Sequence, residues 1–176
     1  MTEEERLDER YRLAFRAEYS ARYHRRRAAF LINLDKLLTA LVLVCGAGAF
    51  VALLDQSPQW LGRAAALSVT FITILQVIFS FGLAGARHGE WLRRWERLAT
   101  DIRAHPLPED NKLREWHELR AGIESECIGE LRGLAIDCEN AARRYLGVPE
   151  GQRRIGRTQR LFIHFGTFQQ EFKIVD

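Results

Sequence analysis

The end of the sequence, residues 148–176, combines arginines with phenylalanines in a pattern that could bind a ligand. The candidate residues are Arg153, Arg154, Arg157, Arg160, Phe162 and Phe165. Guanidinium groups bind phosphates in a planar, bidentate geometry, and aromatic rings stack on bases. A ligand with phosphates and bases is therefore one interpretation of this segment. The other is a packing segment that ties subunits together or touches anionic lipid. Its aromatic-rich runs also predict a short β-hairpin.

A second set of polar side chains lies inside an apolar stretch. Its members are Thr70, Thr73, Gln76 and Ser80. On a helix these positions share roughly a third of the circumference. A glutamine amide in lipid must find a partner or water. The stripe therefore either makes helix-to-helix hydrogen bonds or lines a pore in an oligomer, and the pattern leaves both possibilities open.

Residue types that could support catalysis or bind a metal are present but scattered. They include His88, His105, His117 and His164, together with Cys45, Cys127 and Cys138. No pair of them has metal-ligand spacing. The sequence also has no phosphate-binding glycine loop and no nucleophile elbow. We therefore expect no enzyme activity, no bound metal and no cofactor.

The polar stripe lies in one of two apolar runs, Leu37–Leu54 and Ala64–Ala86, which contain no charged residue. As helices they would cover about 27 and about 35 Å, enough for a hydrocarbon core of about 30 Å. The short link between them contains Pro58 and Gly62, which favour a tight reversal. The sequence therefore predicts an all-α membrane protein built on a transmembrane hairpin. We expect an N-terminal helix at 1–36, the hairpin at 37–86, cytoplasmic helices at 87–147 and a tail at 148–176.

Basic residues flank the open end of this predicted hairpin. Those expected at the membrane interface are Arg25, Arg26, Arg27 and Arg87, whereas the short link offers only Arg63. Cytoplasmic ends of membrane helices carry an excess of arginine and lysine. Both termini are therefore expected in the cytoplasm.

A long helix is predicted from Asp110 or Asn111 to Leu146, before Gly147 and Pro149. Its apolar residues recur at spacings of three and four from Leu113 to Cys138. Such a face needs a partner, which would be the N-terminal helix or another subunit.

Together these features resemble a known family. A tyrosine- and arginine-rich stretch, Tyr19–Arg27, precedes the hairpin. The second run, Thr70–Phe81, contains Gln76 and clustered phenylalanines, and Arg87, His88 and Trp91 open the following helix. Over roughly residues 18–146 the chain resembles the SLATT two-transmembrane effectors of bacterial anti-phage systems.

The resemblance implies a homo-oligomeric pore, a tetramer or larger, in the lipid of the bacterial inner membrane. A partner nucleotidyltransferase would supply the nucleotide or single-stranded oligonucleotide that gates it. Opening would depolarise the membrane during infection. Two other functions remain open: a holin-like lysis protein that needs no ligand, and a membrane-anchored scaffold for a soluble partner.

Overall fold

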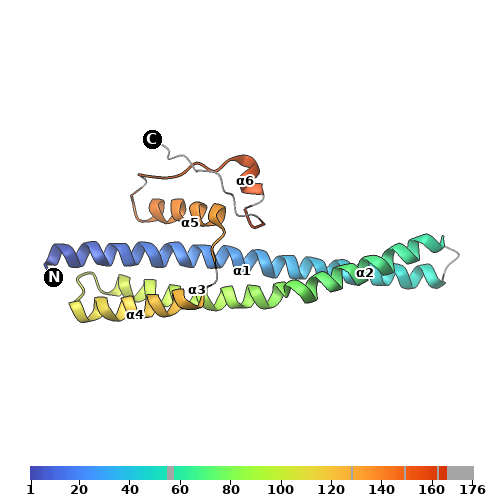
Figure 1. The fold of residues 1–176 in the computed structure, drawn as a ribbon, viewed down its shortest axis with the longest axis horizontal. Coiled ribbons are helices and arrows are strands. Elements are labelled where there is room, and N and C mark those ends of the chain that lie inside the picture. Colours follow the sequence, from blue (N-terminus) through green and yellow to red (C-terminus); the bar gives the residue numbers. More distant parts are fainter. Residues whose placement is uncertain (55–57, 128, 149, 162, 166–176) are drawn as a thin grey trace. The chain divides into compact units, whose positions relative to one another are not determined.

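The computed structural model describes residues 1–54, 58–127, 129–148, 150–161 and 163–165, and its elements are all helices (Figure 1). They are α1 (Glu3–Leu54), α2 (Gln59–Phe79), α3 (Phe81–Ala104), α4 (Asp110–Glu126), α5 (Arg132–Tyr145) and α6 (Arg157–Leu161). The predicted helical class is confirmed. The β-hairpin predicted in the tail is not supported. Helix α6 ends at Leu161, where the predicted hairpin would begin, and residues 166–176 lie outside the described part.

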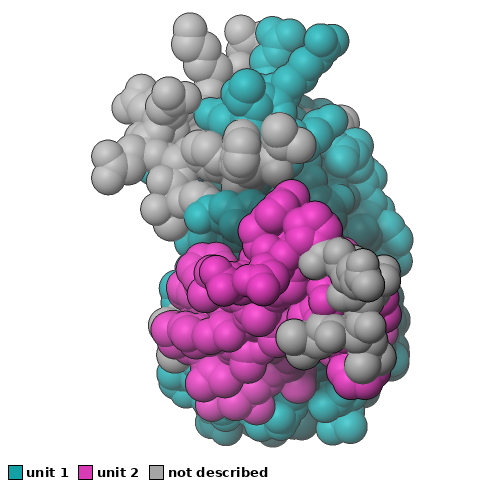
Figure 2. All heavy atoms as spheres, turned by 90° about the vertical axis from the view of Figure 1, so that its right-hand side faces the viewer, with its two compact units in different colours: residues 1–27, 88–176 teal, residues 28–87 magenta. Residues whose placement is uncertain are grey.

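The chain forms two compact units (Figure 2). One is Ala28–Arg87, and the other combines Met1–Arg27 with His88–Asp176. We call them the hairpin unit and the helical unit and describe each by itself. Helices α1 and α3 each contribute to both units, since the boundaries fall at residues 27/28 and 87/88.

The helical unit has a core between α1, α3 and α4. The side chains of Trp95, Trp116 and Ile102 are almost fully buried there, next to Leu13 and Ala17 of α1. The indole Nε1 of Trp116 donates to Asp101, at 2.7 Å. Leu113, Trp116 and Ile123 of the predicted apolar face are thus covered within the same chain, whereas Leu119 is exposed.

A second core lies where α5 meets α1. Tyr19 and Tyr23 of α1 pack with Leu134, Cys138 and Ala142 of α5. This cluster holds α5 against a part of α1 that the first core leaves uncovered.

The predicted single helix from Asp110 to Leu146 is wrong, because α4 ends at Glu126 and α5 begins at Arg132. Gly129 has a φ of 50° in this connection, a left-handed conformation that glycine tolerates well. Cys127 and Cys138 therefore do not lie on one helix, and all three cysteines are free thiols.

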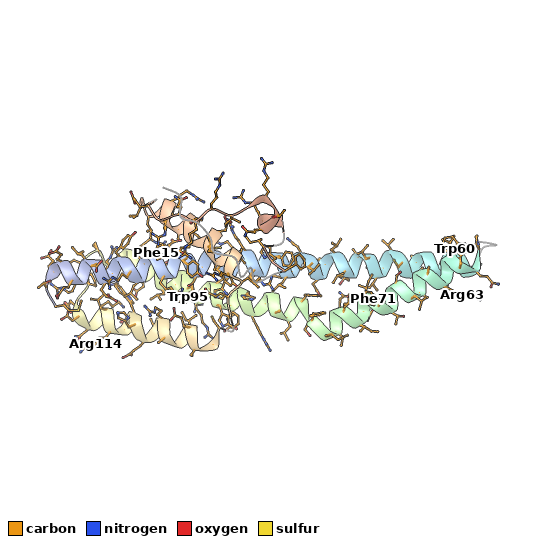
Figure 3. All side chains as sticks on the ribbon, turned by 45° about the horizontal axis from the view of Figure 1, so that its top comes forward. Phe15, Trp60, Arg63, Phe71, Trp95 and Arg114 are labelled. Carbon is orange, nitrogen blue, oxygen red and sulfur yellow. The ribbon has the colours of Figure 1, made fainter. Side chains whose placement is uncertain are left out.

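The hairpin unit pairs the second half of α1 with α2 and the start of α3. The described residues include two helical stretches long and apolar enough to cross a membrane. Large apolar side chains are exposed along them, for example Leu43, Phe71 and Val77. Figure 3 shows Phe71 on this unit. An apolar exterior of this kind suits lipid better than water and indicates a membrane location.

Candidate functional site

The second membrane helix is interrupted at Ser80, where the sequence predicts one continuous span. Ser80 adopts φ 45° and ψ 48° and is the only described non-glycine residue with positive φ. An α-helix would join the carbonyls of Val77, Ile78 and Phe79 to the amides four residues later. None of these bonds forms. The Ser80 hydroxyl donates to the Val77 carbonyl at 3.1 Å.

Unpaired backbone groups therefore lie at this interruption. Within the described residues, the amides of Phe81, Gly82 and Leu83 and the carbonyls of Ile78 and Phe79 have no hydrogen-bond partner. The helical pattern resumes with the Ala84 amide, which donates to Ser80 at 3.0 Å. Each unpaired group would cost about 2 kcal/mol or more in hydrocarbon.

Polar groups from the facing part of α1 surround this interruption. The amide Nε2 of Gln76 donates to the Thr39 hydroxyl at 3.0 Å and approaches the Asp35 carbonyl at 3.5 Å. A Cβ added to Gly82 would lie 3.0 Å from the Asp35 carboxylate. We call Asp35, Thr39, Gln76 and Ser80 the hairpin polar cluster.

The remaining members of the predicted stripe make local contacts only. The hydroxyls of Thr70 and Thr73 donate to carbonyls four residues earlier, Ala66 at 3.0 Å and Val69 at 2.8 Å. Both threonines are exposed on the hairpin unit. Of the four stripe residues, only Gln76 makes a hydrogen bond to α1 among the described residues.

The predicted ligand residues of the tail differ in their surroundings. Arg153 is held by the protein: its amide and carbonyl pair with the Asn140 side chain, and its guanidinium lies 3.7 Å from Glu139. Arg154, Arg157 and Arg160 are exposed and make no side-chain hydrogen bond or ion pair with the described residues. Phe165 is also exposed, and Phe162 lies outside the described residues.

Three of the four arginines predicted at the membrane interface make contacts inside the helical unit. Arg25 pairs with Glu96, Arg26 pairs with Asp137, and Arg27 donates to the His164 carbonyl at 2.6 Å. Arg87 is exposed, with no ion pair among the described residues. The run Arg25–Arg27 therefore also connects α1 to α3, α5 and the tail.

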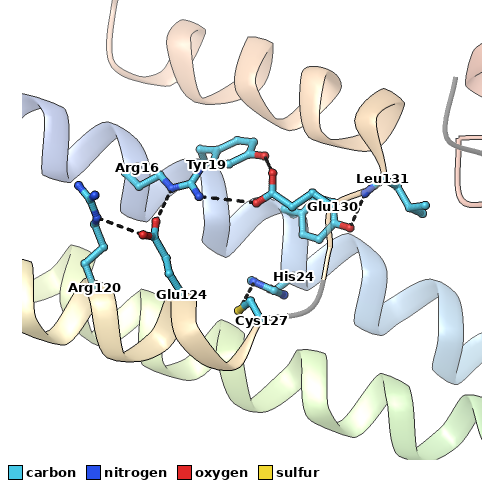
Figure 4. Close-up of polar contacts among 9 residues, drawn as sticks. Arg16, Tyr19, His24, Arg120, Glu124, Cys127, Glu130 and Leu131 are labelled. Atoms are coloured by element: carbon cyan, nitrogen blue, oxygen red, sulfur yellow. Dashed lines mark hydrogen bonds and ion pairs between the residues drawn. The ribbon is translucent and has the colours of Figure 1, made fainter. Parts of the chain in front are cut away.

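A polar network fills the space between α1 and the α4–α5 connection (Figure 4). Arg16 binds Glu124 at 2.7 Å and approaches Glu130 at 3.8 Å, and the Tyr19 hydroxyl donates to Glu130. The Tyr23 hydroxyl accepts from the Leu131 amide at 3.0 Å. This network positions α5, since both tyrosines also pack in the second core.

A pair of imidazoles, His24 buried and His88 partly buried, lies beside this network. Nδ1 of His24 and Nδ1 of His88 are 2.8 Å apart, so one nitrogen must carry the proton and the other must accept it. Burial lowers the pKa of His24 to about 3 and that of His88 to about 4. The Cys127 thiol lies 3.7 Å from the other nitrogen of His24, and burial raises its pKa to about 11. A neutral pair next to a protonated thiol suits packing rather than nucleophilic chemistry.

Sequence reasoning missed Asp35 and Thr39, because both precede or begin the apolar run and look like flanking residues. Their spacing is the sequence feature that could have identified them. Residues four apart share one face of a helix, so Asp35 and Thr39 face the same neighbouring helix. Among the described residues, no group of three or more histidine, cysteine, aspartate or glutamate side chains could hold a metal ion.

The fold and these polar groups define an α-helical membrane-hairpin protein with a separate helical unit. No protein-family model, curated protein or solved structure matches the chain.

Proposed function

We propose that this protein is an oligomeric membrane channel, gated by a nucleotide or single-stranded oligonucleotide, that acts as an effector in bacterial anti-phage defence. The observation that carries the proposal is the unpaired backbone at Ser80 inside an apolar helix. Irregular backbone at membrane depth persists only where it is buried in protein or faces a water-filled cavity.

A single hairpin satisfies neither condition. Ser80 and Phe79 are exposed in one chain, and two helices cannot enclose a conduit. Several copies arranged around an axis would bring the interruption at Ser80 against the water of a conduit. The hairpin polar cluster would then lie along the conduit, and the apolar side chains on the other faces would contact lipid.

The orientation follows from the hairpin and its charges. Gly85 packs on Leu31 and Ile32, so the chain enters and leaves the hairpin at the same end. Exposed basic residues follow the second span at that end, including Arg87, Arg93 and Arg97. Positive charge favours the cytoplasmic side. We therefore infer that both termini are cytoplasmic, with the hairpin in the inner membrane.

The exposed arginines of the tail supply the ligand side of the proposal. Arg157 and Arg160 lie three residues apart on α6, so they share one face of that helix. Together with Arg154 they offer cationic groups that no described carboxylate neutralises. An extended oligonucleotide can contact all three arginines through successive phosphates.

The resemblance of residues 18–146 to the SLATT effectors supplies the link to defence and to a partner nucleotidyltransferase. The two other functions have less support. Most of the apolar face from Leu113 that a scaffold would use is buried within the chain, since Leu113, Trp116 and Ile123 belong to the first core and only Leu119 is exposed on α4. A lysis protein without a ligand has no use for the helical unit or for exposed tail arginines.

Ligand-dependent ion efflux from liposomes tests this function. We expect the purified protein to release ions at a rate that one ligand class, short single-stranded DNA or cyclic nucleotides, switches at least about tenfold. Arg154→Ala/Arg157→Ala/Arg160→Ala should weaken ligand binding and reduce its dependence on salt. The slope should fall by roughly two units if three phosphate contacts are lost, at ~0.7 per contact.

A matched control replaces three exposed arginines outside the tail, Arg93, Arg97 and Arg132. This triple variant has the same change of net charge, and its affinity for the ligand should be close to that of the wild type. Equal losses in both triple variants would mean that binding is nonspecific. Constant efflux without ligand would favour the lysis protein, and no efflux in any condition would favour the scaffold.

A further inference from the structure

The hairpin polar cluster is rich in oxygen acceptors that the protein leaves unused. The Asp35 carboxylate is half-buried and makes no ion pair with the described residues. Gln76 uses its Nε2 as the donor to Thr39, which leaves its carbonyl oxygen available. The carbonyls of Ile78 and Phe79 have no donor among the described residues.

Gly82 makes room for the carboxylate in this arrangement. A Cβ there would lie 3.0 Å from Asp35 Oδ2 and 3.3 Å from its carboxyl carbon, closer than most side chains tolerate. The aspartate therefore lies against the start of α3, on the same face of α1 as Thr39, which accepts a hydrogen bond from Gln76 of α2.

These groups have the chemistry of a cation site. Carboxylate, amide and backbone carbonyl oxygens replace the water around a cation, and rings of aspartate select cations over anions in channels. Each copy offers one negative charge. The copies around a conduit would therefore present several carboxylates to a passing cation and would repel anions.

We propose that the hairpin polar cluster is the selectivity site of the channel and passes cations in preference to anions. The inference rests on the proposed function, since the ring exists only when several copies surround a conduit. Asp35 supplies the charge, Gln76 and the α2 carbonyls supply neutral oxygens, and Thr39 orients Gln76.

Reversal potentials in planar bilayers under a KCl gradient test the proposal. They are measured with or without ligand, whichever condition gives a current. The wild type should be cation-selective. Asp35→Asn should lower the ratio of potassium to chloride permeability about threefold or more. About threefold is the Boltzmann factor for the interaction of an ion with a unit charge at about 7 Å in water. Asp35→Glu should retain the preference. Gly82→Ala, which keeps every charge, should lower it by displacing the carboxylate.

Lys36→Gln is the matched control, because Lys36 is adjacent in sequence but exposed. If Asp35 acts only through the general surface potential, this variant would raise cation preference by a similar factor. The proposal expects little change. A conducting wild type whose ion preference survives Asp35→Asn overturns this inference and leaves the channel intact. A wild type that never conducts overturns the proposed function and this inference with it.

Discussion

Gly85 allows the helices of the hairpin to approach closely. It is buried, and an added Cβ would lie 2.8 Å from Ile32 Cγ1 and 3.3 Å from the Ile32 amide nitrogen. The backbone nitrogen cannot move aside as a side chain can. Close approach through small residues is the usual way in which membrane helices gain packing contacts.

We therefore predict that Gly85→Leu destabilises the hairpin by about 1–3 kcal/mol, the usual cost of overpacking. Gly46→Ala is the control from the same unit, because a Cβ there meets nothing within 4 Å. Unfolding of the full chain in mixed micelles measures both changes. Equal stability of the two variants would contradict the close packing at Ile32.

The paired imidazoles predict how the stability of the helical unit depends on pH. Burial lowers the pKa of His24 and His88 to about 3 and about 4, from an ordinary value of 6.5. Between the ordinary and the lowered values, the unfolded chain binds protons that the folded chain does not. Stability is therefore fully present above pH 6.5 and falls as the pH drops toward 4.

His24 alone should cost about 2 kcal/mol of stability between about pH 6.5 and about pH 4.5, because the unfolded chain binds one more proton over roughly two pH units at about 1.4 kcal/mol each. His88 should add a smaller loss, since it is only partly buried. Tryptophan fluorescence in a Trp60→Phe background measures the combined loss, since Trp91, Trp95 and Trp116 then report on the helical unit alone. His24→Gln/His88→Gln should flatten the dependence between about pH 6.5 and about pH 4.5. An unchanged slope would mean that carboxylates, and not the histidines, cause it.

At the scale of elements, the sequence predicts the helices better than their ends. The two spans are predictable because an uncharged apolar run of this length is rare outside a membrane helix. The α4–α5 break is not, because the apolar spacing continues from Ile123 through Cys127 and Leu131 as if the helix did. Gly129 is the local signal, but glycine inside a helical pattern is often tolerated, so the sequence alone does not decide.

Gly129 also allows a matched test of that break. Its φ of 50° disfavours any side chain, so Gly129→Ala should destabilise the helical unit by about 1–2 kcal/mol. Gly122→Ala lies within α4, where a Cβ meets nothing within 4 Å. It should be neutral or stabilise by up to about 1 kcal/mol, from helix propensity. Thermal unfolding followed by the same tryptophans compares them. Stabilisation by both would indicate one continuous helix.

The interruption at Ser80 is not predictable from the sequence, because α-helix is the default for an uncharged apolar run and serine does not break helices. Only the three-dimensional arrangement shows that Asp35, Gly82 and Gln76 meet there. The pattern identifies the stripe of Thr70, Thr73, Gln76 and Ser80 as polar, but it does not distinguish which of its members reaches α1.

At the scale of the whole molecule, the proposed function assigns ligand binding to one unit and ion conduction to the other. The helical unit carries the exposed arginines that would meet a ligand, and the hairpin unit carries the polar cluster that would meet ions. Helices α1 and α3 belong to both units, so ligand binding in one has a covalent route to the other. In the proposed channel, subunit number, ligand and sign of gating would be properties of the assembled oligomer, which no local pattern in one chain encodes.

Hydrogen exchange in lipid bilayers tests the central claim most directly, namely that the interruption at Ser80 faces water in the assembled protein. Amides exchange slowly when they are hydrogen-bonded or surrounded by hydrocarbon. The amides of Phe81, Gly82 and Leu83 should exchange much faster than those of residues 71–77 in the preceding helix. Equal protection of both segments would show a continuous or lipid-buried span and would contradict the channel.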